Sequence, residues 1–337
     1  MIKMNYGDTE HQKKLEATFQ LLLDDVIARQ KEWTRLKKKL CKLDNTFRTI
    51  LPTKLKKMMV LPYTTLAGMY EKYVDLKLAK TDEIHIDLKA LFSYDTHVNS
   101  KKNKYKALSS DFIEFFKDEN NNFEIHTCHY CDMAYINYFN LGNGKRTQFD
   151  LDHVLDKGSC PLVALSLYNL VPACPTCNGP HIKGKRVMPT SLIQRMKLSP
   201  TSVQYDFENK VKLWIKPKLA KVHNTNFLKH QKDYEIAFDT LQDPDYKVEI
   251  DFFYLHQRYN YHKCKALRLA DLKAQYTPAK IKEMAKIICN IGKRKKLTAT
   301  FASHVVINQI RADIFESGFT DKYHRAFGKL YKDILDL

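Results

Sequence analysis

The spacing of hydrophobic residues predicts helices over most of the first 120 residues. Between residues 8 and 48, apolar side chains recur at steps of three and four, and the pattern skips one position near Arg29. These residues are Leu15, Phe19, Leu22, Val26, Trp33, Leu36, Leu40 and Leu43. This period predicts one long helix with an apolar stripe. A second helix is expected from Thr64 to Ala79, and a short one at Asp111–Phe116. Residues 81–88 alternate briefly between polar and apolar positions.

Alternation with a period of two returns after residue 200. Residues 203–207 and 210–217 both show it, and together they predict a hairpin. From Phe227 onward the pattern is helical, with a helix expected at 252–275, another beginning at Pro278, and the last ones within roughly 300–336. The sequence therefore predicts an α+β fold that is mainly helical.

These patterns divide the chain into three predicted regions. A helical N-terminal region covers 1–120, a central module covers 121–190, and a basic, largely helical C-terminal region covers 191–337. No internal repeat is present, and the chain has no Gly-x-x-x-x-Gly-Lys-Ser/Thr loop. We therefore expect that this chain does not hydrolyse ATP by itself.

The charge of the chain favours a polyanionic partner. Its 337 residues include 56 Lys+Arg against 38 Asp+Glu, a formal net charge of +18, and 44% of them are hydrophobic, which is typical of a globular protein. Residues 121–190 hold 6 basic against 5 acidic residues, whereas residues 191–337 hold 27 against 16. Nucleic acid is a better candidate than membrane, because the apolar runs are too short to span a bilayer. The alternative is that the excess lysines only solvate helix faces.

Two Cys-x-x-Cys pairs predict a structural zinc site. The N-terminus lacks the long apolar stretch of a signal peptide, so we expect a cytoplasmic protein with reduced thiols. Cys128, Cys131, Cys174 and Cys177 can then close a tetrahedral Zn²⁺ site with no open position. The alternative is a redox pair, which lacks a βαβ context here. A histidine, His126 or His129, could replace one thiolate.

Asp152 and His153 carry the candidate chemistry. Hydrolysis of a phosphodiester requires an activated water and a cation that offsets the charge on the phosphate. Histidine is a natural base near neutral pH, and an aspartate is a hard ligand for Mg²⁺ or Mn²⁺. Neighbours in an ideal strand point to opposite faces, so the strand must twist or end at His153 for both to serve one site. Alone, the pair would be read as a loop histidine capped by an aspartate.

The ordered set of residues resembles the HNH endonucleases of the ββα-metal class. It consists of the segment Phe149-Asp-Leu-Asp-His-Val154, a later Asn169, and Cys174-Pro-Thr-Cys177-Asn178-Gly-Pro-His181, together with Cys128-His-Tyr-Cys131, spread over about 60 residues. The resemblance implies a zinc-stapled ββα core with helical flanks. It also implies that Asp152 is the metal-binding acid, His153 the general base and Asn169 the residue that braces the loop.

The last metal ligand implied by the resemblance falls on Asn178. His181, one helical turn later, is the alternative ligand, because it could replace or supplement Asn178 at the metal or contact phosphate. Four basic residues surround this segment and are expected to hold the nucleic-acid backbone: Lys157, Lys183, Lys185 and Arg186.

The function implied is metal-dependent hydrolysis of nucleic acid, with DNA as the expected substrate. Stand-alone HNH proteins of this size with helical flanks are similar to nuclease subunits of bacterial anti-phage or restriction systems, such as the Septu type, in which a separate ATPase or sensor subunit partners the nuclease. The alternative is a zinc-stabilised nucleic-acid-binding module without catalysis. A zinc deaminase is set aside, because Ala173 stands where its proline would be and no His-x-Glu lies upstream.

Overall fold

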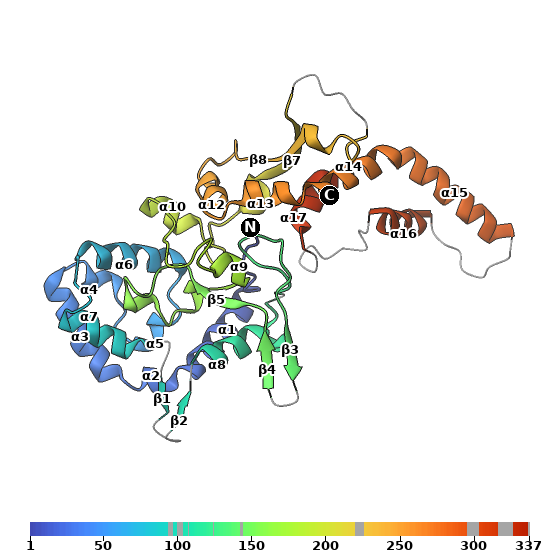
Figure 1. The fold of residues 1–337 in the computed structure, drawn as a ribbon. Coiled ribbons are helices and arrows are strands. Elements are labelled where there is room, and N and C mark those ends of the chain that lie inside the picture. Colours follow the sequence, from blue (N-terminus) through green and yellow to red (C-terminus); the bar gives the residue numbers. More distant parts are fainter. Residues whose placement is uncertain are drawn as a thin grey trace. The chain divides into compact units, whose positions relative to one another are not determined.

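The computed structural model describes residues 1–93, 97–99, 104–106, 108–123, 125–141, 144–219, 226–294, 303–315 and 326–335. Over these residues the chain is mainly helical and contains four small antiparallel sheets of two strands each (Figure 1). This agrees with the α+β, mainly helical expectation. The chain divides into two compact units, residues 1–208 with 244–253 and residues 209–243 with 254–337.

The N-terminal part of the first unit is a set of helices, coloured blue to teal in Figure 1. They are α1 (Thr9–Leu22), α2 (Asp24–Ile27), α3 (Gln30–Leu43), α4 (Phe47–Ile50), α5 (Leu55–Met58), α6 (Tyr63–Asp75), α7 (Glu83–Leu91) and α8 (Leu108–Lys117). A hairpin of β1 (His97–Asn99) and β2 (Lys104–Lys106) lies between α7 and α8 in sequence. The expected helices at 64–79 and 111–116 correspond to α6 and α8.

The single long helix predicted over residues 8–48 was wrong. The chain leaves helical geometry at Leu23 and again at Arg29, the position near which the apolar periodicity is interrupted. A straight helix of that length would extend about 60 Å at 1.5 Å per residue. The two breaks instead let α1 and α3 bury Phe19 and Trp33 in one core. Residues 83–91, including most of the short alternating stretch, form helix α7, because Ile84, Leu88 and Leu91 share a buried face.

The central part of the first unit contains two hairpins. The first pairs β3 (Tyr138–Leu141) with β4 (Gly144–Thr147), and the second pairs β5 (Asp150–His153) with β6 (Leu170–Ala173). In the second hairpin Asp152 lies opposite Val171 and His153 opposite Leu170. The short helix α9 (Pro175–Asn178) follows β6 directly. Strand, long loop, strand and helix thus follow one another without interruption.

The long loop between β5 and β6 is packed into the helical core. It contains two 3-10 turns, η2 (Pro161–Val163) and η3 (Leu167–Asn169), and its apolar side chains belong to the same buried cluster as those of α1, α3 and α6. The amide of Leu167 donates to the carbonyl of Met59 at 2.9 Å, and the hydroxyl of Tyr168 donates to Glu16 at 2.6 Å. The N-terminal helices therefore fix the loop in place.

The first unit is completed by α10 (Leu192–Lys197) and α12 (Tyr246–Phe252). The predicted hairpin partner at 203–207 was wrong, because Tyr205 and Phe207 are buried against Tyr246, with ring centroids 5.7 and 5.3 Å from it. The strand at 212–217 pairs instead with residues 234–239, a region that was expected to be helical. A short helix, α11 (Phe207–Lys210), precedes that strand.

The second unit holds this last hairpin and five helices among its described residues. The hairpin consists of β7 (Lys212–Pro217) and β8 (Tyr234–Asp239), and the helices are α13 (Leu255–Tyr261), α14 (Lys263–Gln275), α15 (Pro278–Arg294), α16 (Ser303–Phe315) and α17 (Gly328–Leu335). The helix predicted at 252–275 corresponds to α13 and α14, and α15 begins at the expected proline. Asp333 of α17 accepts the amide of Leu213 at 2.7 Å and so ties the last helix to β7.

Candidate functional site

The four predicted zinc ligands lie together in the first unit. The sulfur atoms of Cys128, Cys131, Cys174 and Cys177 are all within 4.8 Å of one another, and all four residues are buried. One pair, Cys131 and Cys174, is 4.0 Å apart, close to the spacing of about 3.8 Å that follows from Zn–S distances of 2.3 Å in a tetrahedron. The four cysteines could therefore hold a zinc ion, as the spacing of the pairs predicted.

Backbone amides surround these sulfur atoms as they surround thiolates in structural zinc sites. Cys128 Sγ accepts from the amide of Cys174 at 3.2 Å, Cys174 Sγ from the amide of Cys177 at 3.4 Å, and Cys131 Sγ from the amide of Met133 at 3.5 Å. These donors favour the negatively charged form of sulfur, which is the form that binds metal. The donor set and its surroundings fit Zn²⁺.

The histidine alternatives are not part of this cluster. His129 is buried, and its Nδ1 lies 2.8 Å from the carbonyl of Ile2. Burial lowers the pKa of His129 to about 4. Neither His129 nor His126 is in the group of converging sulfur atoms, which is the one cluster of three or more His, Cys, Asp or Glu ligand atoms among the described residues.

Asn169 connects the two ends of the long loop. Its side-chain oxygen accepts the amide of Leu155 at 2.8 Å, and its side-chain nitrogen donates to the carbonyls of Leu155 and Val163 at 3.0 and 2.9 Å. Asn169 is fully buried, so each of these bonds satisfies a polar group that water does not reach. The side chain thereby fixes the segment that follows His153.

We predict that Asn169→Ala destabilises the first unit by about 3 kcal/mol or more, because it leaves two buried carbonyls and one buried amide without their partner. The measurement is the free energy of unfolding in urea. Asn178→Ala is the matched control, since Asn178 is partly exposed and makes a single side-chain bond, and a change within about 0.5 kcal/mol is expected. Equal stabilities for the two variants would contradict the bracing role.

His153 ends β5 with its imidazole anchored to the loop. Its Nε2 lies 2.9 Å from the carbonyl oxygen of Ala164, and because a carbonyl only accepts, Nε2 carries the hydrogen. In the neutral ring this leaves Nδ1 as the nitrogen that can take up a proton. Ala164 lies in the loop that Asn169 and the N-terminal helices hold. His153 is 9% exposed, so the orientation of its ring is set by packing as well as by the bond to Ala164.

Asp152 is buried and both of its carboxylate oxygens are bonded. Oδ1 accepts from the ammonium of Lys183 at 2.6 Å and Oδ2 from the hydroxyl of Tyr130 at 2.6 Å. Burial raises the pKa of Asp152, while the charge and hydrogen bond of Lys183 act in the opposite direction. Tyr130 lies between the first two cysteines and stacks on Phe253, with ring centroids 4.4 Å apart. The cysteine cluster and Asp152 are thus linked through one side chain.

The other predicted site residues lie nearer the surface. Asn178 is partly exposed and donates to Asp150 at 3.2 Å, and His181 is exposed. Lys185 and Arg186 are exposed, Arg186 over the ring of Phe252 at 5.2 Å, and Lys157 is partly exposed. Lys183 differs from these three basic residues, because it is turned inward and pairs with Asp152. It was expected to hold the nucleic-acid backbone, yet it is only 9% exposed.

The arrangement around Asp152 does not fit the Mg²⁺ or Mn²⁺ ion that the resemblance implies. A divalent cation would need an oxygen of Asp152 that Lys183 and Tyr130 already bond, and it would lie against the ammonium of Lys183. Like charges at such a distance repel strongly where water is excluded. We therefore assign no chemical step to a divalent cation at this position.

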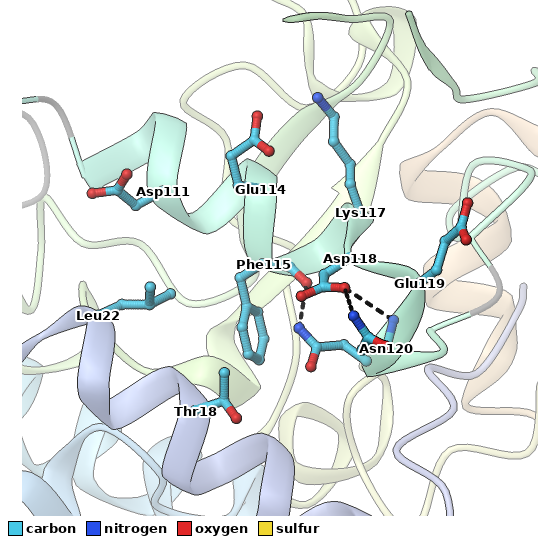
Figure 2. Close-up of a pocket in the computed structure, with 10 residues that line it drawn as sticks. Thr18, Leu22, Asp111, Glu114, Phe115, Lys117, Asp118, Glu119 and Asn120 are labelled. Atoms are coloured by element: carbon cyan, nitrogen blue, oxygen red, sulfur yellow. Dashed lines mark hydrogen bonds between the residues drawn. The ribbon is translucent and has the colours of Figure 1, made fainter.

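A separate hollow of about 450 Å³ lies between α1, α8 and the 3-10 turn η1 (Glu119–Asn121) (Figure 2). Asp111, Glu114 and Asp118 line it together with Glu119, and one basic residue, Lys117, is present. Such a lining repels phosphate, and none of its residues belongs to the candidate site. We assign it no role.

No family model, curated protein or solved structure matches this chain. Sequence reasoning missed Tyr130, although its position between Cys128 and Cys131 marks it as near the cluster, and it missed the carbonyl of Ala164, for which a sequence holds no signal. Along the described part of the chain, no helix combines the length and the apolar character needed to cross a membrane.

Proposed function

We propose that this chain is an endonuclease of the HNH type that hydrolyses phosphodiester bonds of nucleic acid, with DNA as the substrate. The observation that carries the proposal is the anchored imidazole of His153. It ends the first strand of an antiparallel hairpin, its Nε2 is bonded to Ala164, and the loop is braced by Asn169. The short helix α9 follows the second strand of the same hairpin directly. Two of the four clustered cysteines, Cys174 and Cys177, lie at the start of this helix and within it.

The role proposed for His153 is that of general base. With Nε2 committed to a carbonyl, Nδ1 of the neutral ring can accept the proton of an attacking water. A fixed ring orientation favours this, because a base must lie within hydrogen-bonding distance of the water that it activates. Asp152 is adjacent in the strand. Its carboxylate accepts from Lys183, whose ammonium also donates to the carbonyl of His153 at the end of the strand.

The basic residues near the site are proposed to bind the substrate backbone. Lys157, Lys185 and Arg186 lie at or near the surface around α9 and the turn that follows it. Beyond residue 190 the chain has 27 basic against 16 acidic residues, so it can add affinity that does not depend on base sequence. DNA is favoured as the substrate by the resemblance, and the same charges would also attract RNA.

The resemblance and the arrangement at Asp152 disagree about the cation of the proposed nuclease. The resemblance implies Mg²⁺ or Mn²⁺ held by Asp152 with Asn178 or His181. The bonds of Asp152 to Lys183 and Tyr130 do not support that set. A structural Zn²⁺ at the four cysteines is supported by their convergence.

The biological setting proposed is bacterial anti-phage defence or restriction, in the cytoplasm, with a separate ATPase or sensor subunit as partner. It rests on the likeness to stand-alone HNH proteins of this size and on the lack of a nucleotide-binding loop in this chain. The zinc-stabilised nucleic-acid-binding module without catalysis remains the alternative, since the cysteine cluster and the basic charge serve it equally well.

The experiment that separates these functions is a cleavage assay. Zinc-loaded protein is incubated with supercoiled plasmid, single-stranded DNA and RNA, each with Mg²⁺, with Mn²⁺ and without added divalent cation. We expect nicked or linear plasmid to appear with time. Retarded migration of intact nucleic acid in every condition would support the binding module and contradict the nuclease.

A further inference from the structure

The ammonium of Lys183 lies where a metal ion would be expected in a site of this kind. Its Nζ is 2.6 Å from Oδ1 of Asp152 and 2.9 Å from the backbone carbonyl oxygen of His153. A carboxylate oxygen and a carbonyl oxygen are the hard donors that bind divalent cations in proteins. Here they converge on a nitrogen that carries a positive charge.

The pair is buried on both sides. The side chain of Asp152 is 5% exposed and that of Lys183 is 11% exposed. Removing one partner from such a pair leaves an uncompensated charge away from water, which is strongly unfavourable. A divalent ion could bind Asp152 only by displacing the ammonium or by lying beside it, and both are costly in this environment.

The backbone fixes the position of Lys183 independently of its side chain. Its amide donates to the carbonyl of Cys177 at 3.1 Å, so the residue is tied to the second cysteine pair. The chain then turns at Gly184, whose φ of +49° is in the left-handed region, and the amide of Gly184 donates to Gly179 at 2.8 Å. A Cβ at Gly184 would approach Cα of Pro180 to 3.0 Å. The turn is therefore built to direct Lys183 inward.

We propose that the ammonium of Lys183 is the resident cation of this site and takes the place of a divalent metal ion at Asp152. Lys183 is then a positioning residue. It neutralises Asp152 and, by bonding the carbonyl of His153, holds the strand end from which the imidazole projects. The binding part of this inference stands on the Asp152–Lys183 geometry alone. Its consequence for catalysis, that cleavage does not require added Mg²⁺ or Mn²⁺, rests on the proposed function.

The test measures Mn²⁺ binding by electron paramagnetic resonance on folded, zinc-loaded protein. Four proteins are compared: wild type, Asp152→Asn, Lys183→Met and the double variant Lys183→Met/Asp152→Asn. We expect wild type and Asp152→Asn to bind Mn²⁺ alike, because Lys183 already satisfies the carboxylate. Lys183→Met should gain a site of one Mn²⁺ per chain, and the double variant should lose that gain.

Lys197→Met is the matched control. Lys197 also pairs with an aspartate, Asp245, at 3.0 Å, but this pair is partly exposed. Its loss should add no Mn²⁺ site. Zinc content and circular dichroism establish that each variant is folded.

Mn²⁺ bound by wild type and lost in Asp152→Asn would overturn the proposal, and this comparison holds even if Lys183→Met does not fold. A folded Lys183→Met that gains no site would also overturn it. Neither outcome bears on whether the chain is a nuclease, because the plasmid assay decides that independently. Cleavage that occurs only with added divalent cation would preserve the nuclease and contradict the proposed role of Lys183.

Discussion

Replacing His153 by alanine is expected to abolish plasmid cleavage while zinc content, folding and DNA binding stay close to wild type. The imidazole is proposed to take the proton from the attacking water, and such general-base catalysis contributes about 10²–10⁴-fold in rate. Its Nε2 is already bonded to Ala164, so the ring is oriented before substrate arrives. The measurement is the single-turnover rate of nicking, with DNA affinity measured in parallel.

His11→Ala is the matched control for this variant. The Nε2 atom of His11 also lies near a backbone carbonyl, that of Asn121, at 3.0 Å, but His11 belongs to α1 and not to the hairpin. The control should cleave at the wild-type rate. If His153→Ala cleaves as fast as this control, the nuclease assignment for the hairpin is wrong and the non-catalytic binding module becomes the better interpretation.

The cysteine cluster could be predicted from the sequence because its signal is local and chemically specific. Each Cys-x-x-Cys pair forms a turn that presents two sulfur atoms, and two such pairs have few uses in a reduced compartment other than one tetrahedral metal site. The structure brings Cys128 and Cys131 together with Cys174 and Cys177, across more than 40 intervening residues. The residue type alone therefore predicted that these two distant segments of the chain lie together.

The partner of a strand was harder to predict, because alternation identifies a strand but not what it pairs with. Residues 203–207 alternate as a strand would, yet Tyr205 and Phe207 are used to bury Tyr246 in the first unit. The true partner of β7 is Tyr234–Asp239, which lay in a stretch that looked helical. At residues 203–207, packing of aromatic side chains outweighed the local pattern.

The inward direction of Lys183 was also hidden from the sequence. A lysine near a predicted phosphate site is ordinarily exposed, and Lys185 and Arg186 are exposed as expected. The difference comes from the turn at Gly184 and from the hydrogen bond that the backbone amide of Lys183 donates to the carbonyl of Cys177. Together they direct this one side chain toward Asp152. The residue types at the site can be read from the sequence, but which of them pair depends on backbone geometry over a few residues.

The candidate site is carried by small elements, and β5, the long loop, β6 and α9 follow one another directly in the chain. Helix α9 has four residues, and the two strands have four each. Elements this small cannot be stable alone. Their stability must come from the cysteine cluster on one side and from the packing of the loop into the N-terminal helices on the other.

Loss of zinc is therefore expected to unfold the central hairpin and its surroundings. Apparent binding free energies of structural zinc in small zinc-finger peptides are about 10–16 kcal/mol, comparable with the whole stability of an ordinary domain, about 5–15 kcal/mol. Removing one thiolate by Cys174→Ser should lower the zinc content and the unfolding temperature together. Elemental analysis of native protein should find one zinc per chain.

The control for this variant is Cys264→Ser, because Cys264 is exposed and lies in α14 of the second unit. It should keep both zinc and stability. Zinc loss should also release Tyr130 from its place between Cys128 and Cys131, and with it the 2.6 Å bond to Asp152. Nucleic-acid cleavage should then fall in proportion to the zinc lost. Native protein without zinc, or Cys174→Ser protein as stable as Cys264→Ser, would show that the four cysteines do not hold the fold through a metal.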